Sequence, residues 1–494
     1  MPPRLATLLF TVGILGLFLL DREEDSQTSS WLWLPVIWLG IAGSRNVSVW
    51  LGGPSATASA DQYLEGSPLD RVVLTLLLVA GLAVLIARRQ RTIDLLKRNA
   101  PLVLFLMYCA ASVVWSDYPF IAFKRWTKML GNVAMVVIVL TDPDAPRAVR
   151  KFLTRAAFVL IPASILLIKY YSDLGRIYDR WEGIAYYTGV TTDKNMLGCI
   201  CMVFGFGILL RFVETLREIT RQRRRVIAAG SVLAMNLWLF HMAQSATSLG
   251  CFIIGGTLIT VLSLWRRPRP WMVHATVAGM AAVALVAYLF QDAFAVLVES
   301  MGRNTTLTGR TDLWNDVLLM DKRPWFGAGF ESFFLGDRLE FLWSKYWWHP
   351  NEAHNGYLET YLTLGIVGLV LLGLLTLSGY RNVIRLYRSD PASGSLRLAF
   401  LVIAPLYNIT EAAFKVTNPM WILFLLAITA TPSALNCPAA ASAREKLEEE
   451  TRHYPRVPAA WKPVKPDALP LGHRVEPNWM RVRATRSSDP STIT

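Results

Sequence analysis

The run VVLTLLLVAGLAVLIA, residues 72–87, carries no charged side chain. A second run of this kind covers residues 277–290. A helix needs about 17–25 mostly apolar residues to cross a hydrocarbon core of roughly 30 Å, and within lipid only a helix satisfies its own backbone hydrogen bonds in one segment. These runs therefore predict an all-α membrane protein.

The whole composition agrees with that class. Hydrophobic residues make up 53% of the 494 residues, and the mean hydropathy is +0.36, which excludes a water-soluble globular protein. We predict a polytopic transmembrane helical bundle with about 12–13 spans. The predicted spans lie near residues 5–20, 69–87, 100–115, 124–140, 151–169, 194–211, 226–243, 249–265, 271–290, 357–378, 398–412 and 417–433, and the short apolar run 31–43 is either a tilted span or a re-entrant segment.

Lysine and arginine set the predicted orientation. They concentrate in residues 88–98, 147–151, 217–225, 266–269 and 381–388, which fall on one side of the predicted alternation and are therefore expected to be cytoplasmic. The net charge of +14 then reflects topology and contact with anionic lipid, so we predict membrane lipids and no nucleic acid as partners. The predicted parts are N-terminal transmembrane helices (1–290), a large periplasmic catalytic loop containing short helices (291–356), C-terminal transmembrane helices (357–433) and a disordered cytoplasmic tail (434–494).

Other motifs point away from cofactors. The five cysteines lie in predicted spans or in the tail, without the spacing of a metal site or a disulfide framework. Asp142-Pro143-Asp144 has the form of a metal-binding pair of a nucleotide-sugar enzyme, but it lies in a short loop and is better explained as a turn. We predict no metal and no cofactor.

Several cations break the orientation rule. Lysines and arginines at the outer ends of predicted spans are unfavourable for topology unless something compensates them. They either extend to lipid phosphates or bind an anionic ligand, and a lipid diphosphate would need several cations from different helices. The outer cations are Lys124, Arg125, Lys128, Lys169, Arg176, Arg180 and Lys194.

The long polar interval near residues 299–368 supplies a complementary cation. Thr311 is expected to cap a helix that runs to Met320, which would place Arg310 just before a helix N-terminus, where free amides and the dipole favour an anion. The alternative role for Arg310 is a salt bridge to Asp316 or Glu352.

His354 is the candidate base. It stands just before the span that begins near residue 357, and its imidazole can take a proton from a hydroxyl near neutral pH. Asn355 and Glu359 are candidates to orient His354 or a sugar hydroxyl. The alternative is that His354 is only a structural hydrogen-bonding residue.

The motifs together resemble a known superfamily. His354-Asn355 followed by Gly365 and Gly368, with GRTDLW and PWFGAGF before them, resembles the O-antigen ligase and O-antigen polymerase superfamily over roughly residues 100–430. DKNMLG (193–198) and SATSL (245–249) are most similar to its exopolysaccharide-polymerisation branch. The resemblance implies an inverting, metal-independent glycosyltransferase of the bacterial inner membrane, whose active site faces the periplasm. It also implies an undecaprenyl-diphosphate-linked oligosaccharide donor and a glycan acceptor, and it assigns the family's loop arginine to Arg310 and its histidine to His354.

One departure from the family pattern affects the acceptor. Ligases that attach O-antigen to lipid A core tend to carry an arginine where this chain has Ala246. Arg125, Arg180 or Lys194 is then left to supply the second contact with the donor diphosphate, with Asn195 in support. Polymerisation of exopolysaccharide or O-antigen repeats is favoured, together with a flippase and a chain-length co-polymerase as possible protein partners. The alternatives are a ligase that transfers glycan to lipid A core and, in another class, a lipid-linked oligosaccharide transporter.

Overall fold

The structure is a computed structural model that describes residues 1–22, 28–53, 66–178, 185–264, 271, 273–279, 282, 308–320 and 322–431. Residues 1–432 form one compact unit. The predicted tail 434–494, most of the predicted span 271–290 and the beginning of the predicted loop 291–356 lie outside the described residues.

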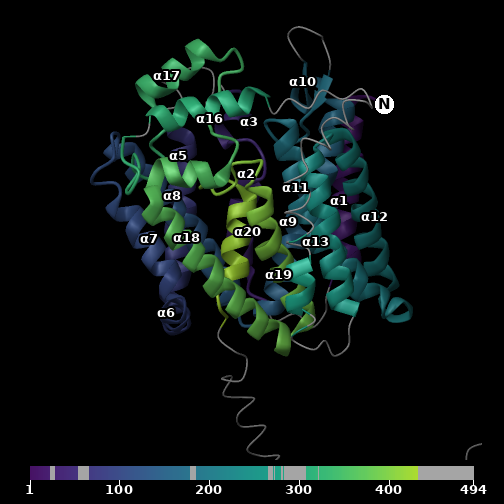
Figure 1. Cartoon of the computed structure of the whole chain (residues 1–494). Coiled ribbons are helices and arrows are strands. Elements are labelled where there is room, and N and C mark those ends of the chain that lie inside the picture. The colour runs from purple at the N-terminus through teal and green to yellow at the C-terminus, as the bar shows by residue number, and fades with distance from the viewer. Residues whose placement is uncertain are drawn as a thin grey trace, which may run out of the picture. The chain divides into compact units, whose positions relative to one another are not determined.

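Helices account for nearly all regular structure in the described chain, so the predicted all-α class is confirmed (Figure 1). The elements are α1 (Pro3–Leu20), η1 (Ser30–Leu32), α2 (Trp33–Ala42), α3 (Val47–Trp50), α5 (Pro68–Ala87), α6 (Arg89–Arg98), α7 (Ala100–Ala111), α8 (Pro119–Leu140), α9 (Ala145–Tyr170), α10 (Ser172–Gly175), α11 (Lys194–Leu216), α12 (Ile219–Ala243), α13 (Ala246–Leu264), α16 (Thr308–Met320), α17 (Gly336–Lys345), α18 (Gly356–Ser389), α19 (Pro391–Tyr407) and α20 (Pro419–Ile428), with β1 (Arg176–Tyr178) antiparallel to β2 (Ala185–Tyr187).

Among the described residues, 7 helices are long and apolar enough to cross a membrane: α1, α5, α9, α11, most of α12, most of α13, and α18. Shorter apolar helices cover residues 30–42, α7, α19 and α20. All of them lie on predicted apolar segments. Helix α8 matches the predicted span 124–140 but begins at Pro119, so the outer cations of this span lie inside the helix.

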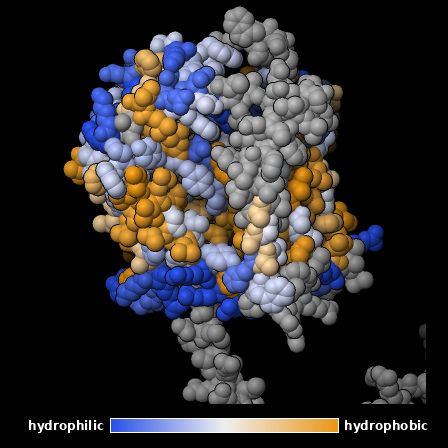
Figure 2. Space-filling view, viewed as in Figure 1, coloured by the Kyte–Doolittle hydropathy of each residue, from blue (hydrophilic) through white to orange (hydrophobic). Residues whose placement is uncertain are grey.

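Polar contacts gather at two opposite ends of the bundle. At the α6 end, Arg88 pairs with Asp142 at 3.5 Å and Arg150 pairs with Glu214 at 3.3 Å. Asp144 caps α9 by accepting from the backbone N–H of Arg147. This agrees with the prediction that Asp142-Pro143-Asp144 forms a turn. Figure 2 shows hydrophilic side chains gathered at this end, below a band of hydrophobic side chains. Helices α16 and α17 lie at the other end (Figure 1).

The outer loop is anchored in a break of helix α18. Gly365 interrupts the helix with φ 67° and ψ −168°, and a Cβ there would lie 2.2 Å from the backbone of Trp325. The freed groups on both sides of the break bond to PWFGAGF: Ala328 and Gly329 donate to carbonyls of α18, and Ile366 donates to the Pro324 carbonyl at 2.9 Å. The motif glycines therefore let the loop replace the missing helical hydrogen bonds.

A second small core holds the outer helices together. Its buried members are Leu313 and Val317 of α16, Leu339 and Leu342 of α17, and Phe333, Phe334, Ala328, Ala353 and Leu362. Apolar residues at helical spacing on α16 thus face α17 and the start of α18. This packing places the polar side of α16 against the loop that carries His354.

Candidate functional site

Arg310 lies in the first turn of α16, because the helix begins at Thr308 and not after Thr311. The expected Thr311 cap is therefore wrong. The Arg310 guanidinium donates to the Thr410 carbonyl at 2.6 Å and lies 4.0 Å from a carboxylate oxygen of Glu411. Arg310 thus has a carboxylate partner, as the structural alternative expected, but the partner is Glu411 and neither of the two that the sequence suggested.

Trp314 links α16 to the loop that carries His354. It follows Arg310 by one helical turn, and its indole N–H donates to the Ala353 carbonyl at 2.7 Å. Asp316, two residues after Trp314 and on another side of the helix, accepts from Lys345 at 2.8 Å and from the Tyr346 hydroxyl at 2.7 Å, which ties α16 to the end of α17. The GRTDLW motif therefore supplies Arg310 and, through Trp314, also holds the backbone of Ala353 next to His354.

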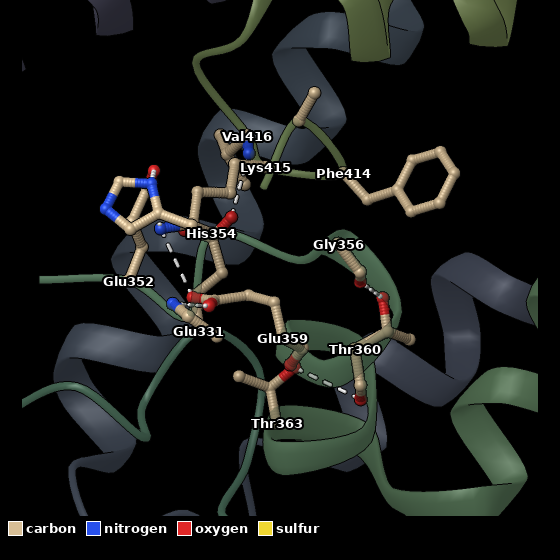
Figure 3. A network of polar contacts seen from close by, with 12 residues as sticks. Glu331, Glu352, His354, Gly356, Glu359, Thr360, Thr363, Phe414, Lys415 and Val416 are labelled. Atoms are coloured by element: carbon tan, nitrogen blue, oxygen red, sulfur yellow. Dashed lines mark hydrogen bonds and ion pairs between the residues drawn. The ribbon is translucent and has the colours of Figure 1, made fainter. Parts of the chain in front are cut away.

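His354 begins a chain of ion pairs (Figure 3). Its Nδ1 lies 3.0 Å from a Glu352 oxygen, the other Glu352 oxygen lies 2.9 Å from the Lys415 ammonium, and Lys415 lies 3.2 Å from Glu359. The His354 backbone has φ 50°, a conformation that is unfavourable for a residue with a side chain and that is concentrated at functional sites. The side chain of His354 is 24% exposed, so a substrate can reach the imidazole.

Asn355 and Glu359 support the backbone around His354, and Glu352 contacts the imidazole. Asn355 caps α18 by accepting from Tyr357 and Leu358, and its amide donates to the Ile409 carbonyl. Glu359 accepts from the backbone N–H of Ala353 at 2.9 Å. Asn355 and Glu359 therefore position the loop that carries His354, and their predicted role in orienting His354 or a sugar hydroxyl stays a prediction.

A tight backbone contact joins this loop to the 408–418 segment between α19 and α20. The N–H of Gly356 donates to the Asn408 carbonyl at 2.8 Å, and a Cβ on Gly356 would lie 1.9 Å from the Asn408 side-chain oxygen. Only glycine permits this approach. The contact brings Glu411 beside Arg310 and brings Lys415 beside Glu352 and Glu359.

The two carboxylates of the cluster differ in proton affinity. Burial raises the pKa of Glu411 to about 7, with Glu352 and Asp193 adding to the rise and Arg310 and His354 opposing it. Burial also acts to raise the pKa of Glu352, but the charges and hydrogen bonds of Lys415 and His354 together hold that pKa well below its ordinary value. Glu352 is thus a fixed anion, and Glu411 changes its charge near neutral pH.

Glu352, His354 and Glu411 offer potential metal ligands that lie within 4.8 Å of one another. Their donor types suit a transition metal such as zinc. However, Lys415 lies 2.9 Å from Glu352 and Arg310 lies 4.0 Å from Glu411, so both carboxylates already face a cation. A metal ion would have to overcome repulsion from both, and the arrangement fits ion-paired side chains better.

The other motifs meet the cluster at its α11 and α13 side. Thr247 of SATSL shares a hydrogen bond with Thr410 at 3.2 Å, next to the carbonyl that accepts from Arg310. Asp193 of DKNMLG caps α11, and the ammonium of Lys194 lies 4.3 Å from the ring centre of Tyr186. Asn195 lies in the first turn of α11.

The remaining predicted diphosphate ligands lie elsewhere. Arg125 donates to the Glu331 carbonyl and lines a cavity on the α8 side. Arg180 lies outside the described residues.

Sequence reasoning missed the parts played by Glu352, Glu411 and Lys415. The available signal was position: Glu411 lies at the end of the predicted span 398–412, and Lys415 lies in the predicted outer interval 413–416. Charged residues beside a membrane span are functional candidates by default. Their pairing with Arg310 and His354 depends on helix packing, which no local pattern reveals.

Comparisons with known proteins agree with these motifs. Residues 230–373 match the family model described as O-Antigen ligase. The chain is 24% identical over 339 residues to the exopolysaccharide production protein ExoQ of Rhizobium meliloti (strain 1021), covering 66% of this chain and 75% of that protein. The predicted resemblance to the O-antigen ligase superfamily, near its exopolysaccharide branch, is confirmed. The matches and the helices together support a multi-pass membrane enzyme of the O-antigen ligase and polymerase type.

Proposed function

Because the chain resembles O-antigen ligases and an exopolysaccharide production protein, we propose that it is an inverting glycosyltransferase of the bacterial inner membrane. Its donor is a glycan on undecaprenyl diphosphate, its active site faces the periplasm, and it joins repeat units of an exopolysaccharide or O-antigen. One observation carries this proposal. His354 and Arg310 lie in one cluster, joined through Glu411, at the end of the bundle opposite α6.

The donor diphosphate binds on the Arg310 side of the cluster. A guanidinium offers a planar fork of N–H donors, which suits two phosphate oxygens. Arg310 is only 24% exposed, so its charge acts in a partly dry site. Lys194, at the start of α11 near Asp193, is the candidate for the second contact.

His354 accepts the proton of the acceptor hydroxyl as that oxygen attacks the anomeric carbon. The new glycosidic bond forms while the bond from that carbon to the diphosphate oxygen breaks, and undecaprenyl diphosphate leaves with the electron pair. Glu352 holds the imidazole and stabilises its protonated form. Arg310 stabilises the charge on the leaving diphosphate.

Glu411 adapts to the bound donor. A diphosphate beside Arg310 adds negative charge near a carboxyl whose pKa is about 7 in the free protein, and this charge favours the protonated form. A protonated Glu411 does not repel the diphosphate and can donate a hydrogen bond to it.

Polymerisation is the favoured reaction, because the curated relative that matches is described by exopolysaccharide production and because Ala246 stands where ligases tend to carry an arginine. The test is incubation of the purified full-length protein with an undecaprenyl-diphosphate oligosaccharide alone. We expect longer lipid-linked chains. Transfer that begins only when lipid A core is added would identify a ligase, and the absence of transfer in both cases would contradict the enzyme proposal and favour a transporter.

A further inference from the structure

A cavity of about 590 Å³ lies on the opposite side of Lys415 from His354. Helices α2, α5 and α8 form its walls, and residues of the outer loop near Glu331 and of the 408–418 segment line its remaining side. Lys415 belongs to both places, because it lines the cavity and lies 2.9 Å from Glu352, the partner of His354. The cavity therefore borders the candidate catalytic cluster at Lys415, and its volume suits a lipid headgroup with attached sugar.

Cations outnumber carboxylates around the cavity. Three carboxylates line it, and each is already engaged by backbone donors: Asp70 by Ser48, Glu331 by Val416 and Glu359 by Ala353. The lining cations are Arg71, Lys124, Arg125, Lys128 and Lys415. Lys415 is itself paired with Glu359 and with Glu352, and the remaining lining cations still outnumber the other two lining carboxylates, so the cavity wall is positive overall.

Lys128 is the most informative of these cations. It lies nine residues into α8, about 13 Å along the helix from Pro119, and so extends the positive charge into an apolar segment. Within the described part of the chain, Lys128 has no hydrogen bond and no ion pair. The carboxylates of Glu331 and Asp70 act on the Lys128 charge without forming an ion pair with it. Because a charge at such depth is unfavourable without a close partner, Lys128 is where an anion would be held.

Part of the cavity wall is apolar. Trp38 and Ile41 of α2, Leu74 and Leu78 of α5, and Ile121 of α8 line it. Cations beside an apolar wall fit a molecule that carries a phosphate at one end and a hydrocarbon chain at the other.

We propose that this cavity binds the phosphate group of a second lipid-linked glycan, the acceptor, with its lipid chain along the α2 and α5 wall. The inference rests on the proposed function, since a transferase that joins two lipid-linked glycans must hold both. The donor diphosphate lies at Arg310 and the acceptor phosphate lies at Lys128. The acceptor glycan then extends past Lys415 toward His354.

The test counts bound lipids by native mass spectrometry of the full-length protein in detergent micelles with undecaprenyl phosphate as probe. We expect two lipids on the unaltered protein, one on Lys128→Gln, one on Arg310→Gln and none on the double variant. Lys128→Gln should weaken binding at its own site about 10- to 100-fold, as expected for the loss of a charge-assisted hydrogen bond. Lys128→Arg should retain two lipids, which separates loss of charge from loss of folding.

Matched controls define the ligand. Lys169→Gln removes another outer lysine, stacked on Trp238 at 5.0 Å and outside the cavity, and should keep two lipids. Undecaprenol, which has no phosphate, should bind no better to the unaltered protein than to Lys128→Gln. Two lipids on Lys128→Gln at unchanged affinity, or equal binding of undecaprenol, would overturn the inference. Displacement of the lipid by equimolar pyrophosphate would assign the site to a free anion and would overturn the lipid part.

A separate elongation assay keeps the two proposals apart. Two bound lipids without any transfer by the unaltered protein would refute the proposed function while the cavity assignment stands. Chain elongation by a protein whose Lys128→Gln variant still binds two lipids would refute the cavity assignment alone.

Discussion

At the scale of single residues, His354 combines an accessible imidazole with a fixed anionic partner. His354→Ala should lower the rate of chain elongation by about 10² to 10⁴, the usual contribution of a general base. The measurement is elongation of a lipid-linked oligosaccharide by purified protein. His241→Ala, which removes an exposed histidine on α12, is the matched control. Unchanged elongation by a correctly inserted His354→Ala protein would remove His354 from the mechanism.

Glu352 acts through His354, and this can be measured as coupling. Glu352→Gln keeps the shape of the side chain but removes the charge that faces both His354 and Lys415. Because one mechanism involves both residues, the Glu352→Gln and His354→Ala effects on rate should not add, with an interaction energy of about 0.5–3 kcal/mol in a double-mutant cycle. Strict additivity would show that Glu352 serves only the fold.

The raised pKa of Glu411 predicts a pH dependence of stability. The folded protein binds a proton at Glu411 with a pKa of about 7, above the ordinary value of 4.5, so this group lowers stability as pH rises from 4.5 through 7. Glu411→Gln should match the unaltered protein at pH 5 and exceed its melting temperature by about 2–4 °C at pH 8. Thermal unfolding in detergent at both pH values is the measurement. An equal difference at both pH values would contradict the raised pKa.

The sequence identified Arg310 and His354 as a pair but not their partners. Both positions are visible in the local sequence, because Arg310 lies at the start of a predicted polar helix and His354 lies just before a predicted apolar span. Glu411 pairs with Arg310 across about a hundred residues, and this pairing exists only because α16 packs onto the 408–418 segment. Local sequence patterns identify candidate catalytic residues, whereas the packing of distant segments decides which charged side chains form pairs.

At the scale of elements, the break in α18 depends on the outer loop. Gly365→Ala places a methyl group 2.2 Å from the Trp325 backbone at a φ of 67°, and we expect it to destabilise loop docking by more than about 1–3 kcal/mol. Gly373→Ala, in the same helix with nothing within 4 Å of the added Cβ, should be neutral. Limited proteolysis of the loop reports the difference. Equal resistance in both variants would show that the break is not held by the loop.

Helix boundaries explain where the sequence prediction fell short. The apolar run near 357–378 reads as one continuous span, because Gly365 is compatible with a helix until the loop replaces its hydrogen bonds. The start of α16 at Thr308 places Arg310 inside the helix, and the start of α8 at Pro119 places Lys124, Arg125 and Lys128 beyond its first turn. For α18, contacts from the outer loop, and not local propensity, set the break.

At the scale of the whole molecule, the alternation of apolar runs and basic loops predicted the two ends of the bundle. Helix α6 lies at one end of the bundle and helices α16 and α17 lie at the other (Figure 1), which agrees with the charge pattern. Because lysine and arginine prefer the cytoplasm, we propose that the α6 end faces the cytoplasm and the His354 end faces the periplasm. The proposed donor depends on this orientation, because undecaprenyl-diphosphate glycans would be used at the periplasmic face.

Cysteine labelling tests the assignment directly. In a Cys437→Ala background, the other cysteines are buried, so a cysteine in place of the exposed Trp347 reports the His354 end and one in place of Arg89 reports the α6 end. A membrane-impermeant maleimide added to spheroplasts should label the Trp347→Cys protein, and the Arg89→Cys protein only after lysis. Labelling of both after detergent treatment is the control for reactivity. The reverse pattern would put His354 and Arg310 in the cytoplasm, where the proposed donor and acceptor sites would face the wrong pool of glycans.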